Sequence, residues 1–110
     1  MTEKIKLVQG DTRPAIVCTI TDATTGTAIN LTGCSIVLKF REVGLDTLQA
    51  TIPGFVLDGA AGSVVFYPAS NPLMLEGEPG DYEGEIEIVF PDGQIQTVYQ
   101  PLKFKVRGDF

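Results

Sequence analysis

Polar and apolar side chains alternate along residues 82–90, with Val89 as the one apolar residue at an outward position. The apolar positions are Tyr82, Gly84, Ile86, Ile88 and Phe90. The acidic positions between them are Glu83, Glu85 and Glu87. Successive side chains of a β-strand point to opposite faces of a sheet. The segment therefore predicts a strand with one apolar face and one acidic face.

A turn follows this strand at once. Pro91-Asp92-Gly93 comes next, and residues 94–99 then alternate again between polar and apolar. An Asp-Gly turn between two alternating runs is a strong local signal for a β-hairpin. We therefore expect residues 82–99 to form a hairpin.

The same alternation predicts four further strands, at residues 4–8, 15–21, 34–41 and 63–67. The side chains that we expect to point inward from the first three are Ile5, Leu7, Ile16, Cys18, Ile20, Ile36, Leu38 and Phe40. Segments rich in glycine, proline and aspartate separate these strands as turns. They are residues 9–14, 22–27 with Gly26 at the tip, and 58–62.

The middle of the chain is less regular. Residues 42–48 are expected to turn the chain, and residues 48–55 predict an edge strand. Pro53-Gly54 interrupts that strand, and proline cannot donate a ladder hydrogen bond inside a central strand. Residues 68–80 predict a long crossover with one helical turn near residues 71–74.

The last strand is expected to contain a one-residue bulge at Pro101. The apolar parity before this proline is set by Ile95, Thr97 and Tyr99, and the parity after it by Leu102, Phe104 and Val106. One inserted residue would restore a single inward face.

Seven or eight short strands with near-regular turns predict a single all-β domain over residues 1–110. The expected architecture is an antiparallel β-sandwich, with a barrel as the alternative. No helical periodicity is evident, and without crossover helices a parallel sheet is disfavoured. The length of 110 residues fits one domain and not two.

Charge and composition exclude several classes of function. The net charge is −6, from 14 acidic and 8 basic residues, whereas nucleic-acid and anionic-membrane surfaces need clustered Lys and Arg. The sequence contains no His, the usual general base and the commonest metal ligand. No segment reaches the ~18 apolar residues of a spanning helix, and residues 1–6 do not resemble a signal peptide. We expect a protein made in a cytoplasm that binds neither nucleic acid nor membrane.

The two cysteines, Cys18 and Cys34, share the inward parity of their strands. This placement predicts two thiols that pack as small hydrophobic side chains. The sequence does not decide whether they meet, and two cysteines without histidine partners make a structural zinc site unfavourable.

The acidic row of Glu83, Glu85 and Glu87 is the strongest candidate for chemistry. Paired carboxylates ~5–10 Å apart can hydrolyse glycosides. The alternative interpretation is a solvated sheet face with cross-strand ion pairs. The basic residues available for such pairs are Lys103 and Lys105, or Lys39 and Arg41. We favour this interpretation, because no apolar pocket is evident that would raise the pKa of one carboxyl.

Other candidate sites are weaker. Asp58 and Asp92 could bind calcium, but each lies in a turn, where aspartate bonds to nearby backbone. Gly10-Asp11-Thr12 lacks the following helix and lysine of a phosphate-binding loop. Without His, a serine triad cannot form. We therefore predict no catalytic, cofactor-binding or metal-binding residue, and no cofactor.

Edges and exposed apolar residues are the better candidates for function. Lys4, Lys6 and Pro53 are typical of edge strands that are protected from pairing, whereas an unprotected edge could accept a partner strand. Outward parity predicts a contact patch that combines Tyr67 with Val8, Val17, Val37, Val65 and Val89.

The order of turns and strands resembles the N-terminal domain of phage upper baseplate proteins, an immunoglobulin-like sandwich. The resemblance covers nearly the whole chain. It rests on Gln9-Gly10-Asp11-Thr12, Asn30-Leu31-Thr32-Gly33 before the strand ending Lys39-Phe40-Arg41, residues 62–67, Gly80-Asp81-Tyr82-Glu83-Gly84-Glu85, Phe90-Pro91-Asp92-Gly93-Gln94 and Lys103-Phe104-Lys105-Val106.

The resemblance implies structural roles only. Leu31 would fill the core, and Tyr82 would close a corner of the sandwich through its hydroxyl. The positions expected to need unusual backbone angles are Gly10, Gly33, Gly62, Gly80 and Gly93.

The resemblance also implies a function. We expect a non-enzymatic structural or adaptor subunit of a tailed-phage or prophage particle, in its tail or baseplate. Its partners would be other virion proteins and symmetric copies of itself, and its location the virion, assembled in the bacterial cytoplasm. Since the related proteins continue into helical and receptor-facing segments, a head or neck accessory (decoration) protein is an alternative. A carbohydrate-binding module using Tyr67, Tyr99 and Phe55 is another, and a hydrolase using Glu83, Glu85 and Glu87 is the third.

Overall fold

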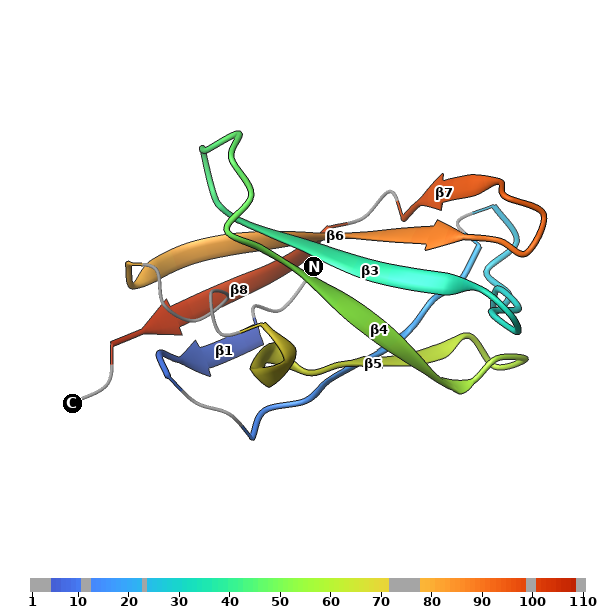
Figure 1. Cartoon of the computed structure of the whole chain (residues 1–110), viewed down its shortest axis with the longest axis horizontal. Helices are drawn as coiled ribbons and strands as arrows, with labels where there is room; N and C mark the ends of the chain where they lie inside the picture. Colours follow the sequence, from blue (N-terminus) through green and yellow to red (C-terminus); the bar gives the residue numbers. More distant parts are fainter. Residues whose placement is uncertain (1–4, 11–12, 23, 72–77, 99–100, 109–110) are drawn as a thin grey trace.

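A computed structural model describes residues 5–10, 13–22, 24–71, 78–98 and 101–108 of the chain (Figure 1). It contains eight β-strands and one 3₁₀ turn, η1 (Pro68–Ser70). The strands are β1 (Ile5–Val8), β2 (Ile16–Thr19), β3 (Ser35–Glu42), β4 (Ala50–Asp58), β5 (Ser63–Phe66), β6 (Gly80–Val89), β7 (Ile95–Thr97) and β8 (Leu102–Arg107). No α-helix occurs in the described residues, so the all-β prediction is confirmed. The helical turn expected near residues 71–74 lies almost wholly outside the described residues, and η1 ends just before it.

The strands form one curled sheet in the order β1-β8-β6-β3-β4-β5-β2, with β7 also beside β6. The sheet has the shape of a half-barrel, in which β4 belongs to both halves. Residues 50–53 of β4 pair with β3, and residues 54–58 pair with β5. The expected number of strands is confirmed, but the continuous sheet does not confirm the immunoglobulin-like sandwich, which stays a prediction.

The first strand corrects the expectation of a wholly antiparallel fold. β1 runs parallel to β8, with Ile5 opposite Phe104 and Leu7 opposite Val106. These strands lie far apart in the sequence and are not joined by a hairpin, so no turn forces them to be antiparallel. Alternation predicts which residues point inward, but not the direction of the neighbouring strand.

The middle strand β4 is not an edge strand, so that prediction was wrong. Pro53 pairs only with Val37 of β3, and the pairing with β5 begins at Gly54. The proline lies where the strand changes partners, so its missing N–H breaks no ladder. A Cβ on Gly54 would lie 2.8 Å from Cε1 of Phe66 and 2.9 Å from Cγ2 of Val64, so only glycine allows the two halves to approach here.

The predicted hairpin joins β6 to β7. The Phe90 N–H donates to the Gln94 carbonyl at 2.8 Å, and the Gln94 N–H donates to Asp92 Oδ1 at 2.9 Å. Both β7 and β8 pair with β6, but Ile88 faces Gln96 while Tyr82 faces Phe104.

This change of register corrects the bulge predicted at Pro101. Without an insertion Tyr82 would face Leu102, so two extra residues, not one, separate the two pairings. Because an even number of inserted residues does not change which positions face inward, the inward positions of β7 share the parity of Leu102 and Phe104. Ile95 and Thr97 therefore point outward. Ile95 is 65% exposed as a result. Tyr99, also expected inward, lies outside the described residues.

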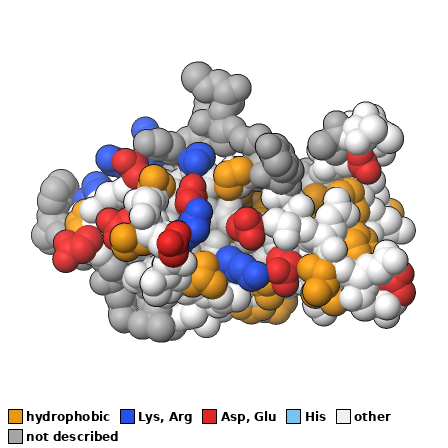
Figure 2. Space-filling model, turned by 90° about the horizontal axis from the view of Figure 1, so that it is seen from above, with side chains coloured by type: hydrophobic (Ala, Val, Ile, Leu, Met, Phe, Trp, Pro, Cys, Tyr) orange, Lys and Arg blue, Asp and Glu red, His pale blue; other side chains and the backbone are white. Residues whose placement is uncertain are grey.

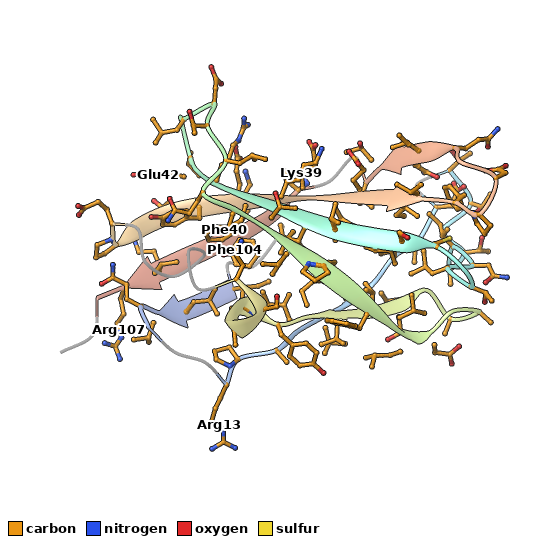
Figure 3. All side chains as sticks on the ribbon, in the orientation of Figure 1. Arg13, Lys39, Phe40, Glu42, Phe104 and Arg107 are labelled. Atoms are coloured by element: carbon orange, nitrogen blue, oxygen red, sulfur yellow. The ribbon has the colours of Figure 1, made fainter. Side chains whose placement is uncertain are left out.

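The inner face of the curled sheet encloses the hydrophobic core. Six of the eight side chains expected to point inward are buried, and Ile5 and Cys18 are half-buried against them. The Phe40 ring stacks on Tyr82 with centroids 4.8 Å apart, and Phe104 meets Phe40 edge-on at 5.1 Å (Figure 3). These aromatic contacts join β3, β6 and β8, because each strand contributes one ring.

Leu31 and Tyr82 have the burial and the backbone contact that the resemblance implies. Leu31 is fully buried, and the Tyr82 hydroxyl donates to the Glu78 carbonyl at 2.6 Å. All five glycines named for unusual angles have positive φ, between 69° and 151°. Gly26 and Gly44 also have positive φ.

Removing one hydroxyl tests the contribution of the Tyr82–Glu78 bond. Tyr82→Phe keeps the ring on Phe40 but leaves the Glu78 carbonyl without this donor, so we expect the free energy of unfolding to fall by about 1–1.5 kcal/mol. Urea denaturation followed by circular dichroism measures the change. The control Tyr67→Phe removes a hydroxyl from an exposed ring and should cost less than about 0.5 kcal/mol. Equal effects of the two variants would show that the Tyr82 bond does not stabilise the fold.

Candidate functional site

The outer face of β3, β6 and β8 carries a network of ion pairs, here called the charged face (Figure 2). Glu83 accepts from Arg41 at 2.8 Å and from Lys103 at 3.3 Å. Lys39 Nζ lies 2.7 Å from Glu87 Oε2. Beyond these, Lys105 pairs with Asp81 at 3.7 Å. The basic residues proposed from the sequence as cross-strand partners therefore do pair with acidic residues of β6.

These ion pairs shift the pKa values of the groups that form them. Hydrogen bonding to Arg41, with a further contribution from Lys103, holds the pKa of Glu83 below its ordinary value. The hydrogen bond to Glu87 raises the pKa of Lys39. A general acid needs a raised pKa, so Glu83 is poorly suited to that role. Glu85 is exposed and has no ion pair among the described residues.

Two hollows are lined by residues from several strands. One, of about 170 Å³, lies on the charged face, lined by Lys39, Arg41, Leu48, Glu83, Gly84, Glu85 and Pro101. The other, of about 400 Å³, lies where the half-barrel stays open between β2 and the β6–β7–β8 side. Its described lining carries no charge, and half of it is aliphatic: Cys18, Thr19, Ile20, Thr21, Ile29, Ile86, Gln96, Thr97, Val98 and Leu102. Among the described lining residues of either hollow, no nucleophile is paired with a base.

The weaker candidates occupy structural positions. Asp58 Oδ1 accepts from the Ala61 N–H at 3.2 Å, and Asp92 accepts within the hairpin turn, as expected of turn residues. Among the described residues no three His, Cys, Asp or Glu side chains are grouped as a metal site would require. Gly10 adopts a positive φ, but Asp11 and Thr12 lie outside the described residues.

Both cysteines are free and half-buried. They pack against the hydrophobic core, in line with the predicted inert thiols. Burial raises the pKa of each thiol, and for Cys34 the charge of Asp92 adds to this effect. A raised pKa reduces the thiolate fraction, which makes either thiol a weak nucleophile.

An apolar patch covers the outer face of β2, β5 and the second half of β4. Val17 lies opposite Val65, and Val65 lies opposite Phe55. The Phe55 and Tyr67 rings are 5.8 Å apart. We define the apolar patch as Val17, Phe55, Leu57 and Tyr67, which are 43–61% exposed. Isolated exposed apolar residues are common, but four adjoining ones are a feature of interaction surfaces.

The contact patch predicted from parity is only partly correct. Val17 and Tyr67 belong to the apolar patch, but Val65 is only 3% exposed because its neighbours cover it. Val8, Val37 and Val89 are half-buried and lie on the other half of the sheet, where Val8 faces Arg107 and Val37 faces Glu87. Parity identifies the outer face correctly but cannot show that β4 divides this face into two surfaces.

A projecting loop, residues 43–48, carries a second group of exposed apolar side chains. It joins β3 to β4 and stands out from the sheet (Figure 1). Val43, Leu45 and Leu48 are 46–51% exposed. The Val43 N–H donates to the Asp81 carbonyl and the Gln49 N–H to the Phe40 carbonyl, at 3.0 and 2.7 Å, so the base of the loop is held. From the sequence we predicted only a turn here. The exposed apolar side chains could have been expected from three aliphatic residues in a segment too short to bury them.

Comparisons with known proteins identify the fold alone. No family model and no curated protein matches the chain. Among solved structures, the N-terminal domain of phage TP901-1 ORF48 superposes with a TM-score of 0.65 at 16% identity, over 98% of this chain and 86% of that one. CopC from Methylosinus trichosporium OB3b superposes with a TM-score of 0.52 at 12% identity, over 97% of this chain and 86% of that one.

In the described residues, no helix is long and apolar enough to cross a membrane.

The acid limb of the stability curve tests the ion pairs of Glu83. Because the pKa of Glu83 is lower in the folded than in the unfolded state, its charged form stabilises the fold above about pH 4.3, the ordinary pKa of a Glu carboxyl. This stabilisation is lost as the pH falls through the lower pKa of the folded state. Glu83→Gln should therefore cost about 1 kcal/mol at pH 7 and low salt, and nothing below both pKa values. Urea denaturation across pH 2–7 checks this.

Glu85→Gln is the matched control for this measurement. It removes an acidic group two residues along the same strand face that has no ion pair among the described residues. We expect a change below about 0.5 kcal/mol at every pH. A loss for Glu83→Gln that persists unchanged at pH 2 would contradict the electrostatic explanation.

Proposed function

We propose that this protein is a non-enzymatic structural subunit of a tailed-phage or prophage particle, in its tail or baseplate. The observation that carries the proposal is the structural likeness to the N-terminal domain of a phage protein over 98% of this chain. At 16% identity the structural likeness shows the fold alone, and the inference from this fold to a function is our own. The order of turns that resembles phage upper baseplate proteins supports the same step.

In this proposal the half-barrel is an immunoglobulin-like fold whose two layers stay joined through β4. The Tyr82 hydroxyl supports the assignment, because it binds backbone four residues upstream, as the corner tyrosine of such domains does. The division of β4 between β3 and β5 supports it as well, since it gives the sheet two halves that enclose one core.

The subunit would work through complementary surfaces rather than chemistry. Glu83 and Glu87 of the acidic row are engaged in ion pairs, and the described lining of the larger hollow is uncharged. The apolar patch and the projecting loop are the described surfaces best suited to partner proteins. In a particle each contact recurs by symmetry, so modest affinities add up through multivalency. The partners would be other virion proteins and further copies of this chain, and the location the virion.

A carbohydrate-binding module is a second candidate, favoured by one observation. Phe55 and Tyr67, two of the three aromatic residues proposed for sugar stacking, lie side by side and are both exposed. The third, Tyr99, lies outside the described residues. The two rings are tilted by 50° and offer no shared plane for a sugar face. We therefore rank this candidate second.

Particles provide the test of the structural proposal. We expect mass spectrometry of purified virions from the encoding phage or prophage to detect the chain in a fixed ratio to the tail proteins. In a strain lacking the gene, complementation with Val17→Asp should lower its recovery in particles at least about tenfold, because a charge is buried in the apolar patch. Thr51→Asp adds the same charge at an exposed position of β4 outside the apolar patch and should be recovered normally. Virions that lack the wild-type chain would refute the proposal.

Glycan binding separates the second candidate from the first. The purified protein should give no signal on a glycan array or by isothermal titration with host cell-wall oligosaccharides. A specific hit that is lost in Phe55→Ala and kept in Leu45→Ala would instead favour the carbohydrate-binding module.

A further inference from the structure

Exposed apolar side chains gather at two places on opposite sides of the molecule. The projecting loop rises from the upper side of the molecule in Figure 1, where Figure 2 shows the charged side chains, whereas η1 and β5, next to Tyr67 in the chain, lie on the lower side. Figure 3 shows Arg13 pointing away from the body on the side opposite Glu42, the last residue before the loop. One copy of the chain therefore presents apolar groups in two opposite directions.

Charges beside these two places are complementary. Arg13 precedes β2, the strand that carries Val17, and is exposed with no ion pair in the described part of the chain. Asp46 lies between Leu45 and Leu48 in the projecting loop and is likewise exposed and unpaired among the described residues. Arg13, four residues before Val17, and Asp46, in the projecting loop, therefore each carry a charge that has no ion pair among the described residues and is available to a partner.

We infer that the projecting loop of one copy docks on the apolar patch of a second copy. Leu45 and its aliphatic neighbours cover Val17, Phe55 and Tyr67, and Asp46 approaches Arg13 at the margin. This inference rests on the proposed structural function and names the partner of its surface. A second copy fits better than a partner of unknown charge, because this chain itself supplies both the apolar and the charged complement.

The contact joins two different surfaces, so it is heterologous. Heterologous contacts lead to a closed ring or to an open stack, depending on the rotation between neighbours. Association of two patches face to face would leave the projecting loop of both copies in water and would not bring Asp46 to Arg13. The head-to-tail arrangement instead covers both exposed groups and pairs opposite charges.

The affinity of one contact is expected to be low. A six-residue loop on a four-residue patch buries less than the ~1,200 Å² of a standard stable interface. Ring closure or a particle scaffold makes the last contact intramolecular and raises the apparent affinity. Self-association of the free protein should therefore appear only at high concentration.

Sedimentation velocity of the purified full chain tests this arrangement by mixing. We expect reversible association of the wild type as its concentration rises. Leu45→Asp or Val17→Asp alone should weaken it at least about tenfold, since each places a carboxylate in an apolar contact. A one-to-one mixture of the two variants should regain dimers but no larger species, because only one intact loop and one intact patch remain per pair. Circular dichroism verifies that each variant is folded.

Charge exchange tests the pairing of Arg13 with Asp46. Arg13→Asp and Asp46→Arg should each weaken association about fivefold, the equivalent of a ~1 kcal/mol exposed pair, and the double variant should restore it. Lys6→Asp makes the same change of charge at an exposed position of β1 and should have no effect beyond that of net charge. Additive losses in the double variant would overturn the proposed pairing.

The outcomes separate this inference from the proposed function. A wild-type chain that stays monomeric at every accessible concentration, or variants that fail to complement on mixing, would overturn the head-to-tail contact even if the chain is present in virions. A chain that self-associates as described but is absent from virions would overturn the particle role and leave the contact intact.

Discussion

The pairing of β3 with β6 is the constraint on which the other features depend. It extends over eight residue pairs, from Ser35 opposite Val89 to Glu42 opposite Tyr82. Because the register is fixed, Leu38 and Phe40 meet Ile86 and Gly84 on the inner face, while Lys39 and Arg41 meet acidic residues on the outer face. A slip of one residue would turn every side chain of β6 to the opposite face and place carboxylates in the core.

The second determinant is the change of partners within β4. Pro53 ends the pairing with β3, and Gly54 allows the second half of the strand to approach Phe66 and Val64. The sheet therefore curls over its own core without closing. This curl separates the outer surface into a charged face and an apolar patch, so that electrostatic and hydrophobic surfaces point in different directions.

Sequence periodicity accounts for much of this fold, because strand geometry imposes a period of two on any half-buried sheet. It correctly predicted the inward side chains of β3 and β6, the Asp92-Gly93 turn and the ion pairs of Glu83. It failed where the outcome depends on contacts between distant segments. The parallel direction of β1, the two-residue insertion before β8 and the division of β4 are set by tertiary pairing that alternation does not encode. The same limit applies to the candidate site: Val65 shares the outward parity but is covered by neighbours from two other strands, and the exposure of Leu45 follows from where the loop projects.

The parallel pairing of β1 with β8 has a mechanical consequence. Residues 5–8 and 104–107 lie side by side and run in the same direction. Tension applied from before β1 to beyond β8 pulls the two strands along their length in opposite senses, so every hydrogen bond between them shares the load at the same moment. An antiparallel pair pulled from the same two ends would open like a zipper, one bond at a time. This arrangement suits a component that must transmit force without unravelling.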